Sequence, residues 1–424
     1  MRDTSASPAA ARLFSPGRKR ILTLDGGGVR GIVSIAFLKV MEESLRERTG
    51  NPDLVLADVF DLIAGTSVGS MLATLLALGR PVDEIERAFR DLAPKIFSGR
   101  STMFGQKRFN ATPLVNGVRS LIGDTTLGSD KLRTGLVIIA KRTDTDSVWV
   151  LSNNPDMPYF EDGPEWDGNK NYKLESLIRA STAAPFLFTP TQITIHTDRF
   201  GKKVDGWFVD GGVTPHNNPA LQALLMAAMP AYRIGWKLSP DDLLMISVGT
   251  GSHRTPVDRG KKIISGMLAG TLLGREKRED IEEAAFAAHT LRALVNNCTQ
   301  LTLKMMQSLS NPRFSWSINS EIGALEDQLL LTCVAGLEPH LDQRGILRFQ
   351  RYDLPLERGR LVSADYDVDA TMEERLSLQA IDRPENIDRL HALALQAARK
   401  QVSAVDFDGF LELGPVANRE SVNS

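Results

Sequence analysis

The segment ILTLDGGGVRG, residues 21–31, is a short apolar run that ends in a cluster of glycines. Apolar side chains recur at helical spacing over residues 32–48, so the segment predicts a strand, a tight turn and a helix. The segment VFDLIAGTSVG, residues 59–69, has the same order and precedes a second helical pattern at residues 71–78. Two successive strand–turn–helix units favour a parallel sheet.

Further short apolar runs alternate with helical patterns along the rest of the chain. The runs lie at residues 135–140, 208–209, 243–248 and 346–352, and the helical patterns at 174–182 and 219–229. This alternation predicts an α/β fold, a three-layer α/β/α sandwich with a mainly parallel sheet between two helical layers. Residues 99–130 and 153–172 lack periodicity and are predicted to be loops.

The composition excludes several classes of protein. The chain has 424 residues, with 50 Lys and Arg against 52 Asp and Glu, a net charge of -2. That balance gives no electrostatic basis for binding nucleic acid. Two cysteines cannot build a disulfide framework or a cysteine-rich metal site, and we predict no metal. No apolar run reaches the ~18 residues of a membrane-spanning helix.

The N-terminal residues do not resemble a secretory signal. The cations Arg18, Lys19 and Arg20 follow a stretch rich in small residues and no long apolar run comes after them. A signal peptide has the opposite order. We therefore expect a cytoplasmic protein without a signal peptide or a transmembrane helix.

The glycine cluster is the first candidate site. Gly26, Gly27 and Gly28 let the backbone approach a ligand closely, and the following helix start favours negative charge. The cluster thus suits a phosphate or a developing oxyanion. Its glycines also fit G-x-G-x-x-G, but a dinucleotide site expects a strand ending in an acidic residue ~20 positions later. Here Glu47 ends a helical pattern, which leaves nucleotide binding as the weaker alternative.

The second candidate site is the sequence Gly65-Thr66-Ser67-Val68-Gly69. It lies between a strand pattern and a helix pattern, the context that a nucleophile elbow requires. Small neighbours allow the sharp turn that exposes the Ser67 hydroxyl. We therefore expect Ser67 to be a nucleophile.

The base for this serine can be sought among histidines or aspartates. His216 and His253 follow the serine near glycine-rich strand ends. Asp210, followed by Gly211 and Gly212, ends an apolar run and is the third candidate. In a dry pocket the basicity of an aspartate rises, because burial disfavours its charged form. The neighbouring pair Asp205-Gly206 is predicted to be a turn.

Taken in order, these motifs resemble those of the patatin-like phospholipase family. The resemblance runs through DGGGVRG at 25–31, GTSVG at 65–69 and DGG at 210–212. It extends to ASTAAP at 180–185, NNP at 217–219 and SVGTG at 247–251. The ordered set covers residues 21–251.

The resemblance implies hydrolysis of fatty-acyl esters of membrane glycerolipids, a phospholipase A type of activity, by a Ser–Asp dyad. By that analogy Ser67 is the nucleophile and Asp210 the base, with no catalytic histidine. Backbone N–H groups of residues 26–28 would form the oxyanion hole, and Arg30 would support that loop. The motif glycines Gly65, Gly69, Gly211 and Gly212 would shape the elbow and the dyad. No cofactor and no calcium are expected.

The resemblance also suggests how the chain is divided. Residues 1–20 are predicted to be a flexible tail and residues 413–424 a polar tail. Residues 21–412 would form one patatin-like domain. Its parts are a catalytic core at 21–251, a largely helical extension at 252–345 and a C-terminal part at 346–412.

The sequence indicates several alternatives for the partners of this chain. The nearly uncharged run Ile263–Leu273 follows Lys261 and Lys262, which fits either a buried helix or an interfacial helix at the inner membrane. Some bacterial members of the family are effectors switched on by a cyclic nucleotide, so such an activator is a further possibility. A lipid-binding or signalling patatin-like protein without catalysis is the alternative to an enzyme.

Overall fold

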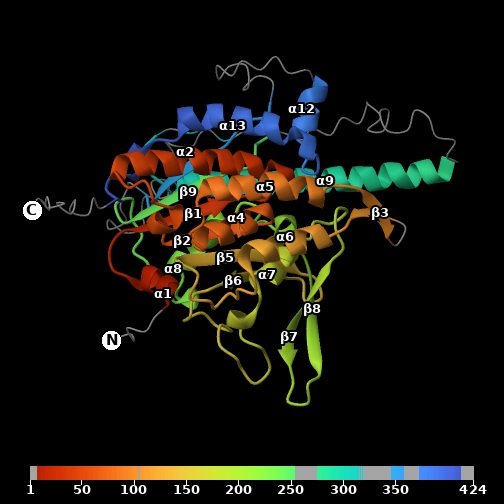
Figure 1. Ribbon diagram of the computed structural model, residues 1–424, viewed down its shortest axis with the longest axis horizontal. Helices are drawn as coiled ribbons and strands as arrows, with labels where there is room; N and C mark the ends of the chain where they lie inside the picture. The colour runs from red at the N-terminus through yellow and green to blue at the C-terminus, as the bar shows by residue number, and fades with distance from the viewer. Residues whose placement is uncertain are drawn as a thin grey trace, which may run out of the picture.

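A computed structural model describes residues 7–103, 106–253, 275–314, 316, 318, 345–357 and 372–411. A mixed sheet runs through its centre, between helices (Figure 1). Its strands are β1 (Lys19–Leu24), β2 (Leu62–Thr66), β5 (Gly135–Arg142), β6 (Ser147–Ser152), β7 (Thr191–Thr197), β8 (Lys203–Asp210), β9 (Leu243–Val248) and β10 (Arg348–Tyr352). Two further strands, β3 (Arg100–Met103) and β4 (Gln106–Phe109), form a separate hairpin.

The sheet has a parallel part and an antiparallel part. Its order is β10-β9-β1-β2-β5-β8-β7, with β6 also paired to β5. The strands from β10 to β5 are parallel, as the strand–helix alternation predicts. Strands β6, β7 and β8 are antiparallel to their neighbours. The prediction of a mainly parallel sheet is therefore confirmed, with an antiparallel end beyond β5.

Two strands share one edge of β5. Strand β2 pairs with the first part of β5, up to the pair Thr66 and Ile139. Strand β8 pairs with the last part of β5, which begins at the pair Asp210 and Ala140. Because β6 occupies the opposite edge, β2 and β8 lie end to end on the same edge. The first is parallel to β5 and the second antiparallel, so their carboxyl ends face each other.

Helices cover both faces of the sheet. They are α1 (Pro8–Phe14), α2 (Gly31–Thr49), α3 (Leu56–Val59), α4 (Val68–Ala77), α5 (Val82–Ile96), α6 (Thr112–Ile122), α7 (Leu174–Ser181), α8 (Ala220–Ala228), α9 (Arg275–Ser308), α12 (Met372–Leu378) and α13 (Ile387–Gln401). The described residues also form the short 3-10 turns η1 (Gly28–Arg30), η2 (Asn169–Asn171), η3 (Gly211–Val213), η4 (Pro230–Tyr232), η5 (Pro384–Asn386) and η6 (Ala404–Phe407).

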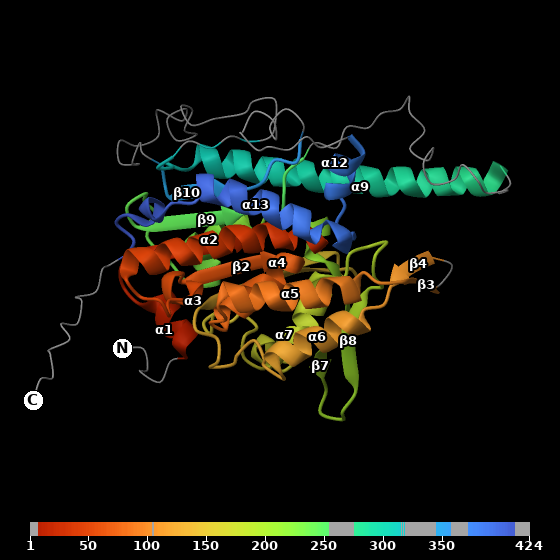
Figure 2. The same ribbon diagram turned by 45° about the horizontal axis from the view of Figure 1, so that its top comes forward.

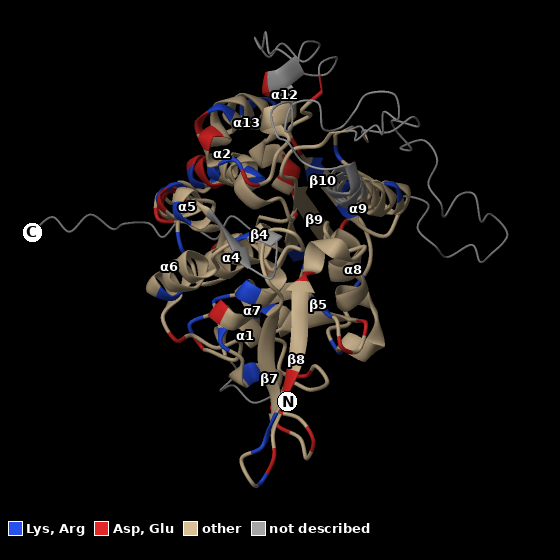
Figure 3. Cartoon of the chain, turned by 90° about the vertical axis from the view of Figure 1, so that its right-hand side faces the viewer, with Lys and Arg blue, Asp and Glu red and all other residues tan. Residues whose placement is uncertain are grey.

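Alternating strand residues divide the core into two layers. Leu22 and Ile63 point to the layer built with α2, α4, α5, α6, α7 and α13. Their neighbours Ile21 and Leu62 point to the layer built with α1, α8 and α9. This period of two is the geometry of a strand buried on both faces. In Figure 3, α2, α5 and α6 lie on one side of the strands and α8 and α9 on the other.

Charge follows the same layering. Lys, Arg, Asp and Glu colour the outer helices α2, α5 and α13 in Figure 3. Helix α5 buries Ile85, Phe89 and Leu92, which recur at helical spacing, and turns its charged residues outward. Helix α4 instead has all of its residues buried, because it lies between the sheet and the outer helices.

The predicted flexible tail at residues 1–20 is wrong from residue 8 onwards. Residues 8–14 form α1, and the side chain of Leu13 in this helix is fully buried. The indole of Trp236 donates a hydrogen bond to the carbonyl of Leu13 at 2.8 Å. Strand β1 already begins at Lys19, which is also buried. The short helix is held by tertiary contacts that its sequence does not reveal.

Two predictions for connecting segments are also wrong. Residues 99–130 contain β3, β4 and the amphipathic helix α6, with Leu114, Val118 and Ile122 buried. Residues 205 and 206, predicted to be a turn, lie inside β8, because that strand forms a long hairpin with β7. Residues 153–172 do lack long elements and contain the short turn η2.

The later parts of the chain join the same body. Strand β10 pairs with β9, and α13 packs against α2. Helix α9 extends past the sheet at one end (Figure 2). The predicted interfacial run Ile263–Leu273 lies outside the described residues. Among the helices that are described, none has the length and apolar character needed to cross a membrane.

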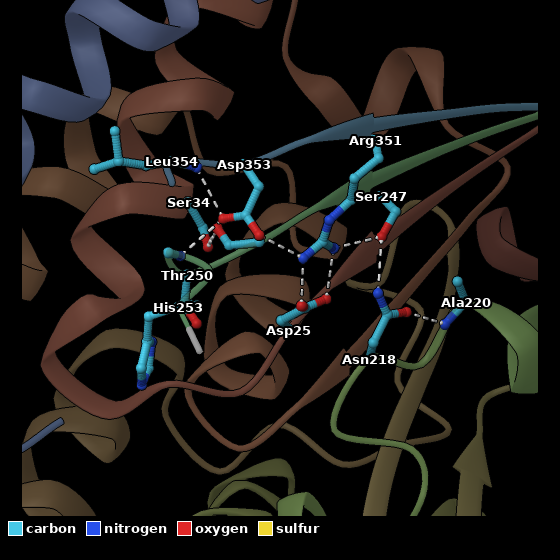
Figure 4. A network of polar contacts seen from close by, with 12 residues as sticks. Asp25, Ser34, Asn218, Ala220, Ser247, Thr250, His253, Arg351, Asp353 and Leu354 are labelled. Carbon is cyan, nitrogen blue, oxygen red and sulfur yellow. Dashed lines mark hydrogen bonds and ion pairs between the residues drawn. The ribbon is translucent and has the colours of Figure 1, made fainter. Parts of the chain in front are cut away.

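A buried ion-pair network ties β10 to the end of β1 (Figure 4). The Arg351 guanidinium donates to both carboxylate oxygens of Asp25 at 3.0 and 2.7 Å. It also contacts Asp353 at 2.9 Å and the hydroxyl of Ser247 at 2.8 Å. The side chains of Arg351 and Asp25 are each 5% exposed. Asp25 starts the glycine cluster, so the network anchors that loop.

Removing the central cation of this network should destabilise the fold. Arg351→Met leaves two carboxylates without their cation, so the free energy of unfolding should fall by about 3–5 kcal/mol. Arg348→Met on the same strand is the control, because that guanidinium donates to the carbonyl of Asp408. Its loss should be about 1 kcal/mol. Urea unfolding followed by circular dichroism measures both, and equal effects would contradict a structural role for the pair.

Candidate active site

Ser67 lies in the sharp turn between β2 and α4. Its backbone has φ 55° and ψ -128°, a conformation that non-glycine residues rarely adopt. Such strain persists only where the surroundings impose it, and it is typical of functional sites. Helix α4 begins at the next residue, so the positive end of its dipole lies at the serine. Ser67 therefore lies in the strand–turn–helix geometry that a nucleophile elbow requires.

The two motif glycines allow this turn because backbone segments touch there. A Cβ atom on Gly65 would lie 2.1 Å from the carbonyl oxygen of Gly69. A Cβ atom on Gly69 would lie 2.2 Å from the carbonyl oxygen of Leu24. Side chains at these positions would push α4 away from β1 and β2.

The side chains of Ser67 and Asp210 are in direct contact. The Ser67 hydroxyl donates to Oδ2 of Asp210 at 2.7 Å. The other oxygen, Oδ1, accepts the Gly212 N–H at 2.6 Å. Asp210 is 4% exposed. Both carboxylate oxygens thus have a partner, and one of these partners is the hydroxyl of the elbow.

Burial changes the acidity of Asp210. It raises the pKa of this carboxyl to about 6, against the hydrogen bonds from Ser67 and Gly212 and the charge of Arg179. Arg179 is itself buried and lies near enough to act on Asp210 through its charge. A carboxylate with this pKa is ionised at neutral pH and is a stronger base than one in water.

A hydroxyl from α7 fixes the elbow from behind. The Ser67 N–H donates to Oγ of Ser181 at 2.9 Å. The Ser181 hydroxyl in turn donates to the carbonyl of Ile139 at 2.6 Å, on β5. The N–H of Asp210 donates to the carbonyl of Ala183 at 3.0 Å. The ASTAAP segment therefore supports both members of the Ser67–Asp210 pair.

The three glycines of the first motif differ in what their N–H groups do. The Gly26 N–H donates to the carbonyl of Asn217 at 3.1 Å. This N–H group is therefore already hydrogen-bonded, which departs from the prediction that residues 26–28 all supply donors to an oxyanion. The N–H groups of Gly27 and Gly28 donate to no acceptor within the described chain. They remain available to an oxyanion at the cavity that Ser67 lines.

Close packing explains why these positions are glycines. A Cβ atom on Gly26 would lie 2.4 Å from Oδ1 of Asn217 and 3.1 Å from Cβ of Ser67. On Gly27 it would meet the Thr250 side chain at 2.3 Å. Gly28 has φ 59°, and a Cβ atom there would meet the carbonyl oxygen of Ile381 at 2.1 Å. The same crowding applies at Gly211, against the carbonyl oxygen of Ile139 at 2.3 Å, and at Gly212.

Arg30 supports a neighbouring loop. It is buried, and it donates to the carbonyl of Gly251 at 3.2 Å and contacts Nδ1 of His253 at 3.0 Å. Burial, with the Arg30 charge as a second cause, lowers the pKa of His253 to about 3. The ring is neutral at pH 7, and its Nδ1 accepts because arginine can only donate.

His216, the other candidate base, contributes its backbone. Its carbonyl accepts the Thr66 hydroxyl at 2.6 Å, and burial lowers the pKa of its ring. It is not among the described residues that line the cavity, whereas His253 is. The arrangement pairs the Ser67 hydroxyl with Asp210 and with neither histidine.

A cavity of about 690 Å³ opens at these groups. Ser67, Asp210, the three glycines and Arg30 lie at its wall. Much of the remaining wall is apolar and comes from α5, α6 and the segment after α7. Examples are Phe89, Leu92, Ile96, Leu114, Phe186 and Phe188. The space suits a hydrocarbon chain beside a reacting ester.

Several contributors to the site were not predicted from the sequence. Arg179, Ser181 and Thr250 act through contacts between distant segments. The Thr250 hydroxyl, for example, donates to the carbonyl of Gly26 at 2.9 Å. Ser181 and Thr250 do lie in segments that the family resemblance singled out, which was the available signal. Within the described chain, no cluster of three or more His, Cys, Asp or Glu side chains could hold a metal ion.

Comparison with known sequences shows which proteins this region resembles. Residues 22–224 match the model of the family described as patatin-like phospholipase. The cGAMP-activated phospholipase of Escherichia coli (strain TW11681) is 30% identical over 240 residues, which are 55% of this chain and 62% of that protein. Patatin-15 of Solanum tuberosum is 28% identical over 245 residues, 55% of this chain and 60% of that protein. The matches thus span less than two thirds of these relatives.

Solved structures are more distant. The human GIVD cytosolic phospholipase A2 has a TM-score of 0.40 and 13% identity, covering 91% of this chain and 60% of that one. VipD from Legionella pneumophila has a TM-score of 0.31 and 11% identity, covering 91% and 67%. These likenesses are too remote to support an argument. The sequence match shows that residues 22–224 of this chain are similar to patatin-like phospholipases.

Proposed function

We propose that this chain is a lipid acyl hydrolase that cleaves fatty-acyl esters of membrane glycerolipids through a Ser67–Asp210 dyad. The observation that carries the proposal is the 2.7 Å hydrogen bond from the strained Ser67 to the buried carboxylate of Asp210. The apolar cavity in front of this pair and the relatives named as phospholipases support a lipid substrate.

The proposed reaction has two steps. In the first, Asp210 takes the hydroxyl proton as Ser67 attacks the ester carbonyl and gives it to the departing alkoxide, so that an alcohol leaves and an acyl-enzyme forms. In the second, Asp210 takes a proton from the water that attacks the acyl-enzyme and returns it to the Ser67 oxygen as the fatty acid is released. The negative oxygen of each tetrahedral intermediate would accept hydrogen bonds from the N–H groups of Gly27 and Gly28. Such donors contribute about 3 kcal/mol to the transition state.

The proposal also includes an activator and a location in the cell. The E. coli relative is a cGAMP-activated phospholipase, which supports cGAMP, a cyclic nucleotide, as a candidate activator. Adding cGAMP to an ester-hydrolysis assay tests this directly. Because the proposed substrate resides in a bilayer, we also propose peripheral contact with the inner membrane, which vesicle sedimentation tests. A lipid-binding protein without catalysis would bind vesicles but hydrolyse no ester.

The dyad predicts a specific pH dependence. Asp210 acts in its ionised form and has a pKa near 6, so kcat/KM should be level above that pH and fall tenfold per unit below it. The fall would begin near pH 3.8 if the carboxyl were unperturbed. Initial rates on a p-nitrophenyl ester from about pH 4 to about pH 8 measure this.

Ser67→Ala and Asp210→Asn serve as controls for that profile. Each should lower kcat by at least about 10³-fold, because nucleophile and base act as a unit. Retention of activity in either variant would exclude the dyad.

The histidines should be dispensable for the chemistry. His216→Asn and His253→Asn should retain most of kcat, since neither imidazole contacts the Ser67 hydroxyl in the structure. These variants also test the fall of kcat/KM at low pH, because a histidine with its ordinary pKa would titrate in the same pH range, whereas burial lowers the pKa of both these rings. A loss of kcat as large as that of Ser67→Ala would establish a triad instead. So would a kcat/KM that no longer falls below about pH 6.

The glycine loop should act in the transition state. Gly27→Ala would place a Cβ atom against the Thr250 side chain, so the loop and its N–H groups must shift. We expect kcat to fall by about 10²-fold with a small change in KM. Thr250→Ser, which keeps the hydroxyl bonded to Gly26, is the matched control. Normal kcat with raised KM in Gly27→Ala would make the loop a ground-state binding site, and circular dichroism must show that the variant is folded.

A further inference from the structure

Helix α9 presents polar side chains to the cavity that contains Ser67. His289, Arg292 and Asn296 line this cavity, together with the apolar Leu291 and Val295. The polar three are spaced three and four residues apart, which places them on one face of the helix. This helix lies outside residues 22–224, so the family motifs assign these side chains no role.

Two of these groups have no partner within the described chain. Arg292 forms no ion pair with any described carboxylate, although it lines the cavity and is accessible. The Nδ1 atom of His289 is buried and has no hydrogen-bond partner there. Buried polar atoms without partners are uncommon in native proteins and call for an explanation, such as an absent ligand.

Arginine side chains gather in this part of the cavity. Burial lowers the pKa of Arg30 to about 10, the charge of Asp353 opposes this shift, and the nearby charge of Arg292 adds to it. Among the residues that the structure describes, Arg383 also lines the cavity. The described aspartates in the lining are Asp210, which is paired with Ser67, and Asp382. Bringing two guanidinium groups together costs free energy, which an anion between or beside them would offset.

We propose that α9 supplies a phosphate subsite, formed by Arg292 and His289, that holds the headgroup phosphate of a glycerophospholipid while its acyl ester reaches Ser67. This inference rests on the proposed hydrolase function. A guanidinium can donate two parallel hydrogen bonds to a phosphate, and an imidazole N–H can add a third. The chain would therefore prefer phosphate-bearing lipids over uncharged glycerides. Free phosphate has the same chemistry, so the experiments must separate the two sources.

Kinetics on matched substrates tests the preference. Dihexanoylphosphatidylcholine and dihexanoylglycerol carry the same acyl chains and are used below micelle formation, which removes effects of an interface. Arg292→Gln should lower kcat/KM for the phospholipid about tenfold more than for the glyceride, mainly through KM. Arg292→Lys should recover part of the difference, and His289→Ala should share the direction of the effect. Lys304→Gln, about three turns further along α9, removes a charge outside the cavity and should change neither substrate.

Equilibrium binding to the Ser67→Ala protein tests the subsite without turnover. Titration with glycerophosphocholine and with inorganic phosphate should show binding of the diester that Arg292→Gln weakens about tenfold. In the kinetic experiment, an equal loss of kcat/KM for the phospholipid and the glyceride in Arg292→Gln would overturn the subsite. Binding of glycerophosphocholine that Arg292→Gln leaves unchanged would overturn it as well. Binding of inorganic phosphate alone would overturn the headgroup assignment. Arg292-dependent diester binding in a chain that hydrolyses no ester would uphold the subsite and reject the proposed function.

Discussion

The geometry of the site depends on how one edge of β5 is divided. Each residue of that edge can pair with one neighbour, and β2 leaves it after Ile139 while β8 takes it from Ala140. The carboxyl ends of β2 and β8 consequently meet, and the residues that follow or end them are Ser67 and Asp210. A slip of β8 by one residue would move Asp210 by about 3.3 Å and turn it to the other face. The hydroxyl–carboxylate contact is thus a property of strand register, which the hairpin with β7 helps to fix.

Burial of this pair carries a cost that also serves the chemistry. An ionised carboxylate in a dry site is unfavourable, and Asp210 tolerates it with two hydrogen bonds and a nearby arginine charge. These partners do not fully offset the desolvation, so its pKa remains raised. In the proposed mechanism this residual imbalance would strengthen the base, because a proton taken from the serine would neutralise a charge that the cavity disfavours. The same apolar wall that creates the imbalance suits an acyl chain.

The sequence identifies the groups at the site better than the connections between them. The glycines at 26–28, 65, 69, 211 and 212 each lie where a Cβ atom would collide with backbone or with a packed side chain, a local demand that leaves a visible motif. Antiparallel pairing of β8 and docking of α1 depend on partners that are distant in the chain. Short patterns such as WFV or PAAARLF do not specify such partners, and this is why residues 205–206 and the N-terminal helix were predicted incorrectly.

The site also combines parts with different origins in the chain. Ser67, Asp210 and the glycine loop lie within residues 22–224, whereas Arg351, which anchors Asp25, and α9, which lines the cavity, lie outside them. In the proposed reaction, the first set would carry the chemistry at the ester. The rest of the lipid would contact the remaining lining of the cavity, part of which comes from α9. The proposal thus divides the site, with the reaction assigned to the motif residues and the preference among substrates assigned to α9 and the segment around Arg383, which also line the cavity.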